Sequence, residues 1–194
     1  ILDKCTTTII QQVEELKKLV NEFSQFARLP SARLMASDLN EIITDALVLF
    51  KVGHTGVQFQ FRPGIIPELE LDREQIKRVL MNLLDNAVAA VNGRGEVTLA
   101  TDFDPQAAVV RFEVADNGCG IAREMRSKIF EPYFSTKENG TGLGLTIVSQ
   151  IVEDHRGYIR VRPNDPQGTR FIVELPAGIR ARVHVTPKNA LHSL

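Results

Sequence analysis

Two asparagine side chains, at the ends of the run NLLDN over residues 82–86, could offer neutral oxygens to a hard cation. Residues four apart share one face of a helix, and amide oxygens are ligands that Mg²⁺ accepts. Taken alone, Asn82 and Asn86 are equally compatible with a solvated helix face. The apolar residues interleaved with them predict a largely buried helix, however, and buried amides require partners.

A second candidate is the run DNGCGI over residues 116–121, which directly follows a predicted strand. Asp116, at the strand end, can accept a hydrogen bond from an exocyclic amine such as that of adenine. Gly118 and Gly120 permit backbone angles that other residues avoid and allow a ligand to approach the chain closely. A plain turn is the alternative, because Asp-Asn-Gly strings are common in turns.

A third candidate is the run GTGLGL over residues 140–145, which opens a predicted helix. Main-chain N–H groups and the positive end of the dipole at a helix N-terminus suit a phosphate. No Gly-Lys-Ser/Thr follows, and the run is not inside a βαβ unit, so neither a P-loop nor a dinucleotide fold is indicated. In the preceding loop, Lys137 could reach a phosphate as a point charge or could be a solvated loop lysine.

The elements that must position these residues fall into two parts. Residues 1–28 predict one helix with a heptad seam, which needs a partner helix; its members are Ile9, Val13, Leu16, Val20, Phe23 and Ala27. Pro30 ends that helix. We expect a bundle helix over 1–30, a linker over 31–37, a catalytic domain over 38–176 and a basic tail over 177–194.

Within 38–176, hydrophobic periodicity predicts helices and strands in irregular alternation. A helix over about 39–51 is capped by Asp38 or Asn40, and a third helix is capped by Asp72. The latter's apolar stripe comprises Ile76, Leu80, Leu83, Leu84, Ala87 and Val91. Strands are expected near 57–61, 96–101, 108–115, 157–162 and 169–175, with a helix over 143–154. This order predicts an α+β fold, a two-layer sandwich of helices on one face of a mixed, mostly antiparallel sheet.

The composition excludes several classes of protein. The chain has 194 residues, with 23 Lys and Arg against 24 Asp and Glu, so its net charge of −1 gives no reason to expect nucleic-acid binding. No apolar run approaches the ~18–20 residues that span a bilayer. The two cysteines lack companions at metal-binding spacing, which fits a reducing compartment. The chain opens on Ile1, so we expect a fragment of a longer protein.

The three runs, in this order and at these distances, resemble the catalytic ATP-binding domain of bacterial sensor histidine kinases, which has the GHKL (Bergerat) fold. Residues 82–86 resemble the family's N box, 116–120 its G1 box, 130–134 its F box and 140–144 its G2 box. The resemblance covers about residues 38–176. The first helix is similar to the second helix of the family's dimerisation and phosphotransfer bundle, and residues 134–145 resemble the nitrogen-regulation sensors.

The resemblance implies ATP and Mg²⁺ as cofactors. Asp116 would bind the adenine amine, Asn86 would ligate Mg²⁺ with Asn82 beside it, and Lys137 would meet the phosphates; Asn82, Asn86 and Lys137 would be the catalytic residues. Further implied nucleotide contacts are Gly118, Gly120, Ile121, Phe134, Thr141, Gly142, Leu143, Gly144, Leu145 and Thr169. Residues 135–144 would form a lid, anchored by Phe130 and Phe134.

Two departures from the family pattern matter. Many members carry Lys or Arg where this chain has Ala89, so the phosphate charge must be met elsewhere, for example by Lys137. None of the four histidines, His54, His155, His184 and His192, is followed by an acidic residue as the family's phosphoacceptor is. The resemblance therefore implies a truncated protein-histidine kinase that phosphorylates a His outside this chain. A response-regulator receiver domain would then accept the phosphoryl group on an Asp.

The resemblance also implies a homodimer through the N-terminal helix bundle and a cytoplasmic location, with any membrane anchor in segments outside this chain. Alternatives remain at this point. A water-activating ATPase of the same superfold would carry Glu in place of Asn82 as a general base, and an amide cannot take a proton. Serine-directed kinases of the superfold are a further alternative, against which the bundle-like first helix argues. A non-catalytic nucleotide-sensing or dimerisation module is the alternative outside enzymes.

Overall fold

The computed structural model describes residues 31–137 and 140–178, and also six helical residues of the N-terminal segment: Thr6, Ile10, Val13, Leu16, Lys17 and Val20. The remainder of the helix predicted over 1–30, and the tail from residue 179 onward, lie outside the described residues. Among the helices of the described part, none combines the length and apolar character needed to cross a bilayer.

A five-stranded sheet forms one layer of the molecule. Its strands, in spatial order, are β2 (Val57–Arg62), β4 (Gly95–Asp104), β5 (Val109–Asp116), β7 (Thr169–Pro176) and β6 (Tyr158–Pro163). Only the β2–β4 pair is parallel, and the other three pairs are antiparallel. The prediction of a mixed, mostly antiparallel sheet is confirmed.

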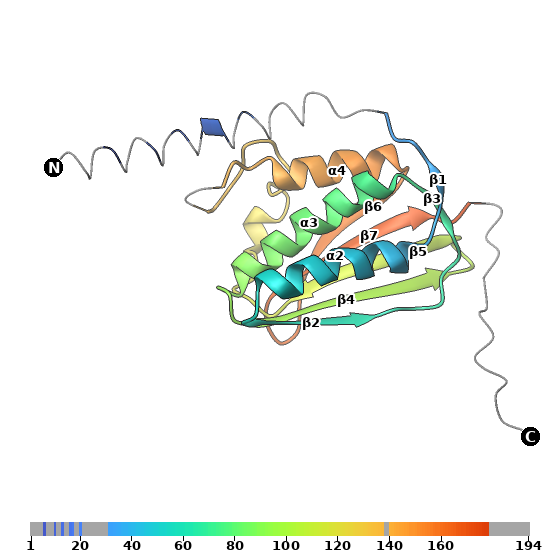
Figure 1. Cartoon of the computed structure of the whole chain (residues 1–194), viewed down its shortest axis with the longest axis horizontal. Helices are drawn as coiled ribbons and strands as arrows, with labels where there is room; N and C mark the ends of the chain where they lie inside the picture. The colour runs from blue at the N-terminus through green and yellow to red at the C-terminus, as the bar shows by residue number, and fades with distance from the viewer. Residues whose placement is uncertain are drawn as a thin grey trace, which may run out of the picture.

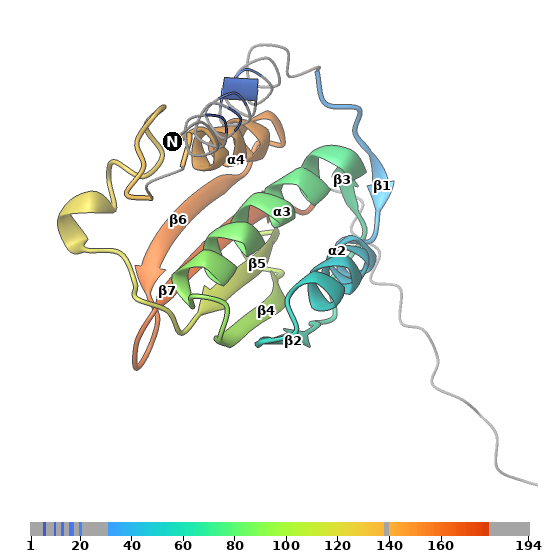
Figure 2. The same ribbon diagram turned by 60° about the vertical axis from the view of Figure 1, so that its left-hand side comes forward.

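Three helices form the other layer: α2 (Leu39–Gly53), α3 (Arg73–Ala90) and α4 (Gly144–Asp154). All three lie on the same face of the sheet, as two views show (Figures 1 and 2). The apolar stripe predicted for α3 is buried throughout, with Ile76, Leu80, Leu83 and Leu84 at 0% exposure. The two-layer α+β sandwich is therefore confirmed.

Two of these helices begin at aspartate side chains that cap them, at the positions predicted from the sequence. Asp38 Oδ1 accepts hydrogen bonds from the main-chain N–H groups of Asn40 and Glu41, at 2.7 and 3.4 Å. Asp38 is thus the cap, and Asn40 instead bonds to Gly64 O and Thr101 Oγ1. Asp72 caps α3 in the same way, satisfying N–H groups that have no partner within the helix.

Three short elements were not predicted. β1 (Met35–Ser37) pairs antiparallel with β3 (Leu69–Leu71), and the 3₁₀ turn η1 (Arg123–Met125) follows the 116–121 run. The interval 31–37, expected to be a linker, therefore includes a strand. Elements of three residues are too short to display a period in the sequence.

His155 joins the start of α3 to the end of α4. The ring is 4% exposed; its Nε2 accepts the N–H of Asp72 at 3.0 Å, and its Nδ1 lies 2.7 Å from Ile151 O. Because Asp72 supplies a donor, Nδ1 must carry the proton that bonds Ile151. Both ring nitrogens have structural partners, which agrees with the expectation that His155 is not a phosphoacceptor.

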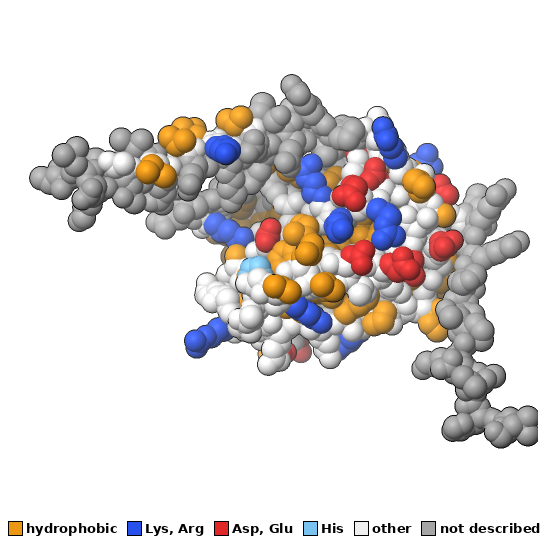
Figure 3. Space-filling view, in the orientation of Figure 1, with side chains coloured by type: hydrophobic (Ala, Val, Ile, Leu, Met, Phe, Trp, Pro, Cys, Tyr) orange, Lys and Arg blue, Asp and Glu red, His pale blue; other side chains and the backbone are white. Residues whose placement is uncertain are grey.

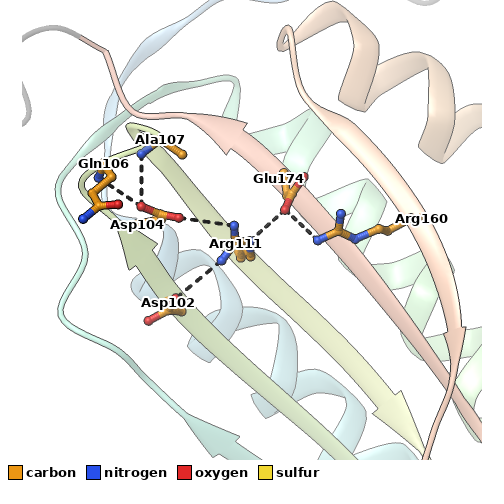
Figure 4. A network of polar contacts seen from close by, with 7 residues as sticks. All are labelled: Asp102, Asp104, Gln106, Ala107, Arg111, Arg160 and Glu174. Carbon is orange, nitrogen blue, oxygen red and sulfur yellow. Dashed lines mark hydrogen bonds and ion pairs between the residues drawn. The ribbon is translucent and has the colours of Figure 1, made fainter.

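Ion pairs cover the sheet face that the helices leave open. Glu174 on β7 accepts from Arg111 Nε on β5 at 2.7 Å and from Arg160 Nη2 on β6 at 2.8 Å (Figure 4). Arg111 also lies 3.5 Å from Asp104. Cross-strand pairs of this kind stabilise a sheet. On the opposite face of the molecule, acidic and basic side chains are interspersed around the helices (Figure 3).

Replacing Glu174 by Gln tests this network. We expect the free energy of unfolding to fall by about 1–2 kcal/mol, because two guanidinium groups lose their shared carboxylate in a partly screened site. Denaturant unfolding at low and at high salt measures the change, which should shrink as salt rises. Asp102→Asn is the matched control, because Asp102 is 74% exposed and 4.0 Å from Arg111. Equal effects of the two substitutions would contradict the assignment.

Candidate functional site

The candidate residues meet at one end of the molecule. Asp116 ends β5, Thr169 begins β7 and Gly144 begins α4, and these ends lie beside the C-terminal end of α3, at the left of Figure 1. Four segments that are distant in the sequence therefore converge. Glycines and polar side chains at such a junction leave main-chain groups accessible.

Asp116 is the most constrained polar group of the site. Its side chain is 3% exposed. Its Oδ1 accepts the main-chain N–H of Gly118 at 2.8 Å and of Thr169 at 3.2 Å. Among the described residues, none donates to Oδ2. One carboxylate oxygen thus holds two protein segments together, and the other can accept a hydrogen bond from a ligand.

Burial raises the pKa of the Asp116 carboxyl, and the hydrogen bonds from Gly118 and Thr169 oppose that shift only in part. A charged group that is desolvated without a cation beside it is typical of a site that binds or transforms a ligand.

The glycines around Asp116 permit close packing of main chains. A Cβ on Gly118 would lie 2.5 Å from the carbonyl carbon of Ala90, at the end of α3. Gly118 thus lets the turn pack closely on helix α3. This packing role was not predicted from the sequence, which suggested a contact with the nucleotide. Gly120 has φ +75° and Gly168 has φ +114°, and a Cβ on Gly168 would overlap the main-chain oxygen of Asp116.

The two asparagines of α3 contact two different segments. Asn82 Nδ2 donates to Arg78 O at 2.9 Å, and a Cβ on Gly144 would lie 2.7 Å from Asn82 Oδ1. Asn86 Oδ1 accepts a hydrogen bond from Lys137 Nζ at 2.8 Å. The prediction that Asn82 and Asn86 share a helix face is confirmed, and both side chains are half-buried.

These donors fit Mg²⁺ bound together with a substrate. Within the described ranges, no three His, Cys, Asp or Glu side chains gather into a group that could hold a metal. Asn86 Oδ1 and Asn82 Oδ1 are hard, neutral oxygens. Mg²⁺ is commonly held by one or two protein oxygens, with water and substrate phosphates completing its coordination.

The loop before α4 is held by hydrogen bonds at its base. Tyr133 N donates to Gly142 O at 3.1 Å, and Gly142 has φ +70°. Thr146 Oγ1 on α4 donates to Phe130 O at 3.2 Å. These contacts join the 130–134 segment to the start of α4, so the two sequence runs form one structural unit.

Several of the implied nucleotide contacts are packing residues. Leu143 is 0% exposed, so only its main chain can face a ligand. Ile121, Phe130, Phe134 and Leu145 are half-buried against the core. Thr141 Oγ1 accepts from Leu143 N at 3.4 Å, and Thr169, 3% exposed, contributes its main-chain N–H.

Three residues support the site without having been predicted. Asn164 Nδ2 donates to Asp116 O at 2.9 Å, Gly168 admits the Asp116 main chain, and Ser135 Oγ bonds to the main chain of Lys137. The string Asn164-Asp165-Pro166 signals a turn. Nothing in that string indicates contact with a strand 48 positions earlier in the chain.

Comparisons with known proteins agree on one family. Residues 71–179 match the histidine kinase-, DNA gyrase B- and HSP90-like ATPases. The nitrogen regulation protein NtrY of Azorhizobium caulinodans is 38% identical over 87% of this chain and 22% of its own length. The sensory histidine kinase/phosphatase NtrB of Rhodobacter capsulatus is 32% identical over 88% of this chain and 52% of its own. The chain therefore spans between a fifth and about half of these relatives.

Solved structures show the same architecture. The catalytic domain of the histidine kinase ThkA is 37% identical and superposes with a TM-score of 0.67, over 75% of this chain and 96% of its own. Full-length ShkA in complex with AMPPNP is 28% identical, with a TM-score of 0.77 over 91% of this chain and 39% of its own. ThkA in complex with the response regulator protein TrrA is 30% identical, with a TM-score of 0.75 over 91% and 52%.

The buried carboxyl predicts a pH-dependent stability difference between Asp116 and Asn. Because its pKa is raised in the folded state, the charged form destabilises the fold above that pKa, and the cost disappears below the pKa of the unfolded chain. Asp116→Asn should therefore be more stable than the wild type near pH 7, and this gain should shrink as the pH falls toward 4. Thermal unfolding across that range measures it. A gain that grows on acidification would contradict the assignment.

Proposed function

The chain belongs to the family of histidine kinase-, DNA gyrase B- and HSP90-like ATPases, as the ATP-binding catalytic portion of a sensor histidine kinase, and from that premise we propose how its residues act. We propose that Asp116 binds the adenine amine of ATP and that the ends of α3 and α4 hold the phosphates with Mg²⁺. The γ-phosphoryl group passes to a His outside this chain.

The observation that carries this proposal is the geometry of Asp116. Its Oδ1 is fixed by the N–H groups of Gly118 and Thr169, so the carboxylate cannot turn away from the site. Its Oδ2 remains able to accept from an amino group. A fixed acceptor discriminates strongly against a ligand that lacks the matching donor, because the buried oxygen is then left unpaired.

Asn86, with Asn82 beside it, holds Mg²⁺ on the phosphates, where the ion neutralises charge during phosphoryl transfer. The main-chain N–H groups at the start of α4, next to Gly142 and Gly144, accept phosphate oxygens. Lys137 supplies the positive charge that many family members place at the position of Ala89. The work of these residues is positioning and charge neutralisation, since none of them forms a covalent bond with the phosphoryl group.

The proposed partners are an acceptor His, a second copy of the helix bundle and a response regulator. His155 is buried and bonded at both ring nitrogens, so we propose that the acceptor His lies on a bundle helix outside this chain. Val13, Leu16 and Val20 are helical with 57–61% exposure, which supports a bundle segment over 1–30 and a homodimer. The ThkA–TrrA complex supports a response-regulator partner, and similarity to NtrY and NtrB supports a role in nitrogen regulation. A cytoplasmic location of this portion stays part of the proposal.

Asn86→Ala tests the metal assignment. We expect the affinity for a non-hydrolysable ATP analogue to fall roughly tenfold or more in Mg²⁺ and much less in EDTA, because the substitution removes a ligand of the ion. Titration calorimetry in both conditions measures this. Gln150→Ala, which removes an exposed amide whose partner among the described residues is Asp154, is the matched control. Equal losses with and without Mg²⁺ would remove Asn86 from the metal site.

The adenine assignment is tested with Asp116→Asn in the same titration. An amide would turn an N–H toward the adenine amine, so we expect a loss of about 1–3 kcal/mol of binding free energy, or roughly 5–150-fold in affinity. The folded state of the variant is checked by its thermal unfolding. Near-wild-type affinity in a folded variant would refute the role of Asp116.

Transfer of the γ-phosphoryl group is tested in trans. The chain is mixed with a separately produced acceptor bundle from a related kinase and with γ-labelled ATP, and acid-labile label on the bundle is measured. At an ATP concentration below the wild-type Kd, we expect label with the wild type and at least several-fold less with Asp116→Asn. Good nucleotide binding without any transfer to several such bundles would favour the non-catalytic module.

A further inference from the structure

Lys137 and Asn86 are 51 positions apart, and the Lys137 ammonium donates to Asn86 Oδ1 at 2.8 Å. This is the oxygen that the proposed function assigns to Mg²⁺. The contact joins the loop before α4 directly to α3. The position of Lys137 in that loop therefore depends on whether Asn86 Oδ1 is free to accept its hydrogen bond.

The loop is shaped to present Lys137 at this point. The N–H of Lys137 donates to Ser135 Oγ at 3.1 Å, and Lys137 O accepts the N–H of Gly140 at 3.1 Å. A Cβ on Gly140 would overlap Ser135 Oγ, so glycine at this position leaves room for the hydroxyl that bonds Lys137. The main chain of Lys137 is thus hydrogen-bonded through both its N–H and its carbonyl oxygen.

An ammonium group and a divalent cation do not readily bind to the same oxygen atom at the same time. Each is attracted to the same lone pairs, and two cations within a few ångströms repel one another. Asn86 is half-buried, and the amide oxygen has no net charge with which to hold both cations. The nearby alternative for the ammonium is the phosphate chain of a bound nucleotide, which Lys binds as a point charge.

We propose that Lys137 and Mg²⁺ compete for Asn86 Oδ1, so that Lys137 serves as the cation of the site until Mg²⁺ displaces it toward the phosphates. The inference rests on the proposed function, because it takes Asn86 as a metal ligand and ATP as the substrate. Lys137 is then a positioning residue that couples arrival of the metal to the placement of the loop. In this chain it also supplies the charge that Ala89 lacks.

Lys137→Met tests the competition. The affinity for a fluorescent, non-hydrolysable ATP analogue is measured in EDTA and at saturating Mg²⁺, and the ratio of the two affinities is compared with that of the wild type. We expect the ratio to rise about tenfold, because binding in EDTA loses the substitute cation while binding in Mg²⁺ no longer requires its displacement. The variant Lys128→Met, which removes an exposed lysine preceding the same loop, should leave the ratio unchanged.

Two outcomes would overturn the inference while the proposed function stands. An equal fall in both affinities would make Lys137 a phosphate ligand alone, and unchanged affinities would make it a solvated lysine. By contrast, a wild type that binds no nucleotide in either condition would overturn the proposed function itself.

A double-mutant cycle isolates the contact from the other interactions of Lys137. In EDTA, the loss of binding free energy in the double variant should be smaller than the sum of the losses caused by Lys137→Met and by Asn86→Ala, because each substitution removes the same hydrogen bond. Strict additivity would mean that the two side chains act independently, which would refute a shared oxygen.

Discussion

The buried carboxylate of Asp116 is the constraint around which the site is built. One of its oxygens accepts N–H groups from the turn after β5 and from the start of β7, and its main-chain oxygen accepts the Asn164 side chain. The surrounding glycines are required because main chains approach Asp116 too closely for a Cβ, at Gly168 above all. Two neutral hydrogen bonds could hold these segments equally well without the cost of desolvating a charge. A charge kept at such a position points to a ligand that needs a strong acceptor.

Helix α3 contacts the other segments of the site and so links their positions to that of the turn that follows Asp116. Asn82, Asn86 and Ala90 are spaced by four residues, so they form one stripe along the helix. Asn82 lies against Gly144 at the start of α4, Asn86 bonds Lys137 of the loop, and Ala90 packs on Gly118 of the turn after β5. The other side of the same helix is anchored in the core through its buried apolar stripe. A shift of α3 would therefore move all three contacts at once, so one rigid element would keep the proposed adenine, metal and phosphate sites in register.

The sequence predicted the parts of this arrangement that depend on local chemistry. The caps Asp38 and Asp72, the apolar stripe of α3 and the period-two strands each have a signal within a few residues, and the structure has them where they were expected. The stripe from Asn82 to Ala90 was predicted only as a shared face for two amides, because its partners come from segments 28 to 62 positions away. The support from Asn164 and the tight fit of Gly168 had no local signal for the same reason. The packing of Gly118 on Ala90 also had no local signal, since a glycine that admits a ligand and one that admits a helix look alike in sequence.

The same geometry explains why this unit suits phosphoryl transfer to another protein segment rather than to water. Hydrolysis needs a group that can take a proton from the attacking water. At the position nearest the start of α4, the chain has the Asn82 amide, whose Nδ2 is already bonded to Arg78 O and whose oxygen is far too weak a base. If no such base lies beside the phosphates, as at Asn82 among the described residues, a bound nucleotide would be protected from water until a better nucleophile is delivered. An imidazole is a better nucleophile than water near neutral pH and needs no prior deprotonation when neutral. The proposed transfer therefore requires a second element that carries the imidazole, and the exposed apolar residues Val13, Leu16 and Val20 are the side chains proposed to assemble with it.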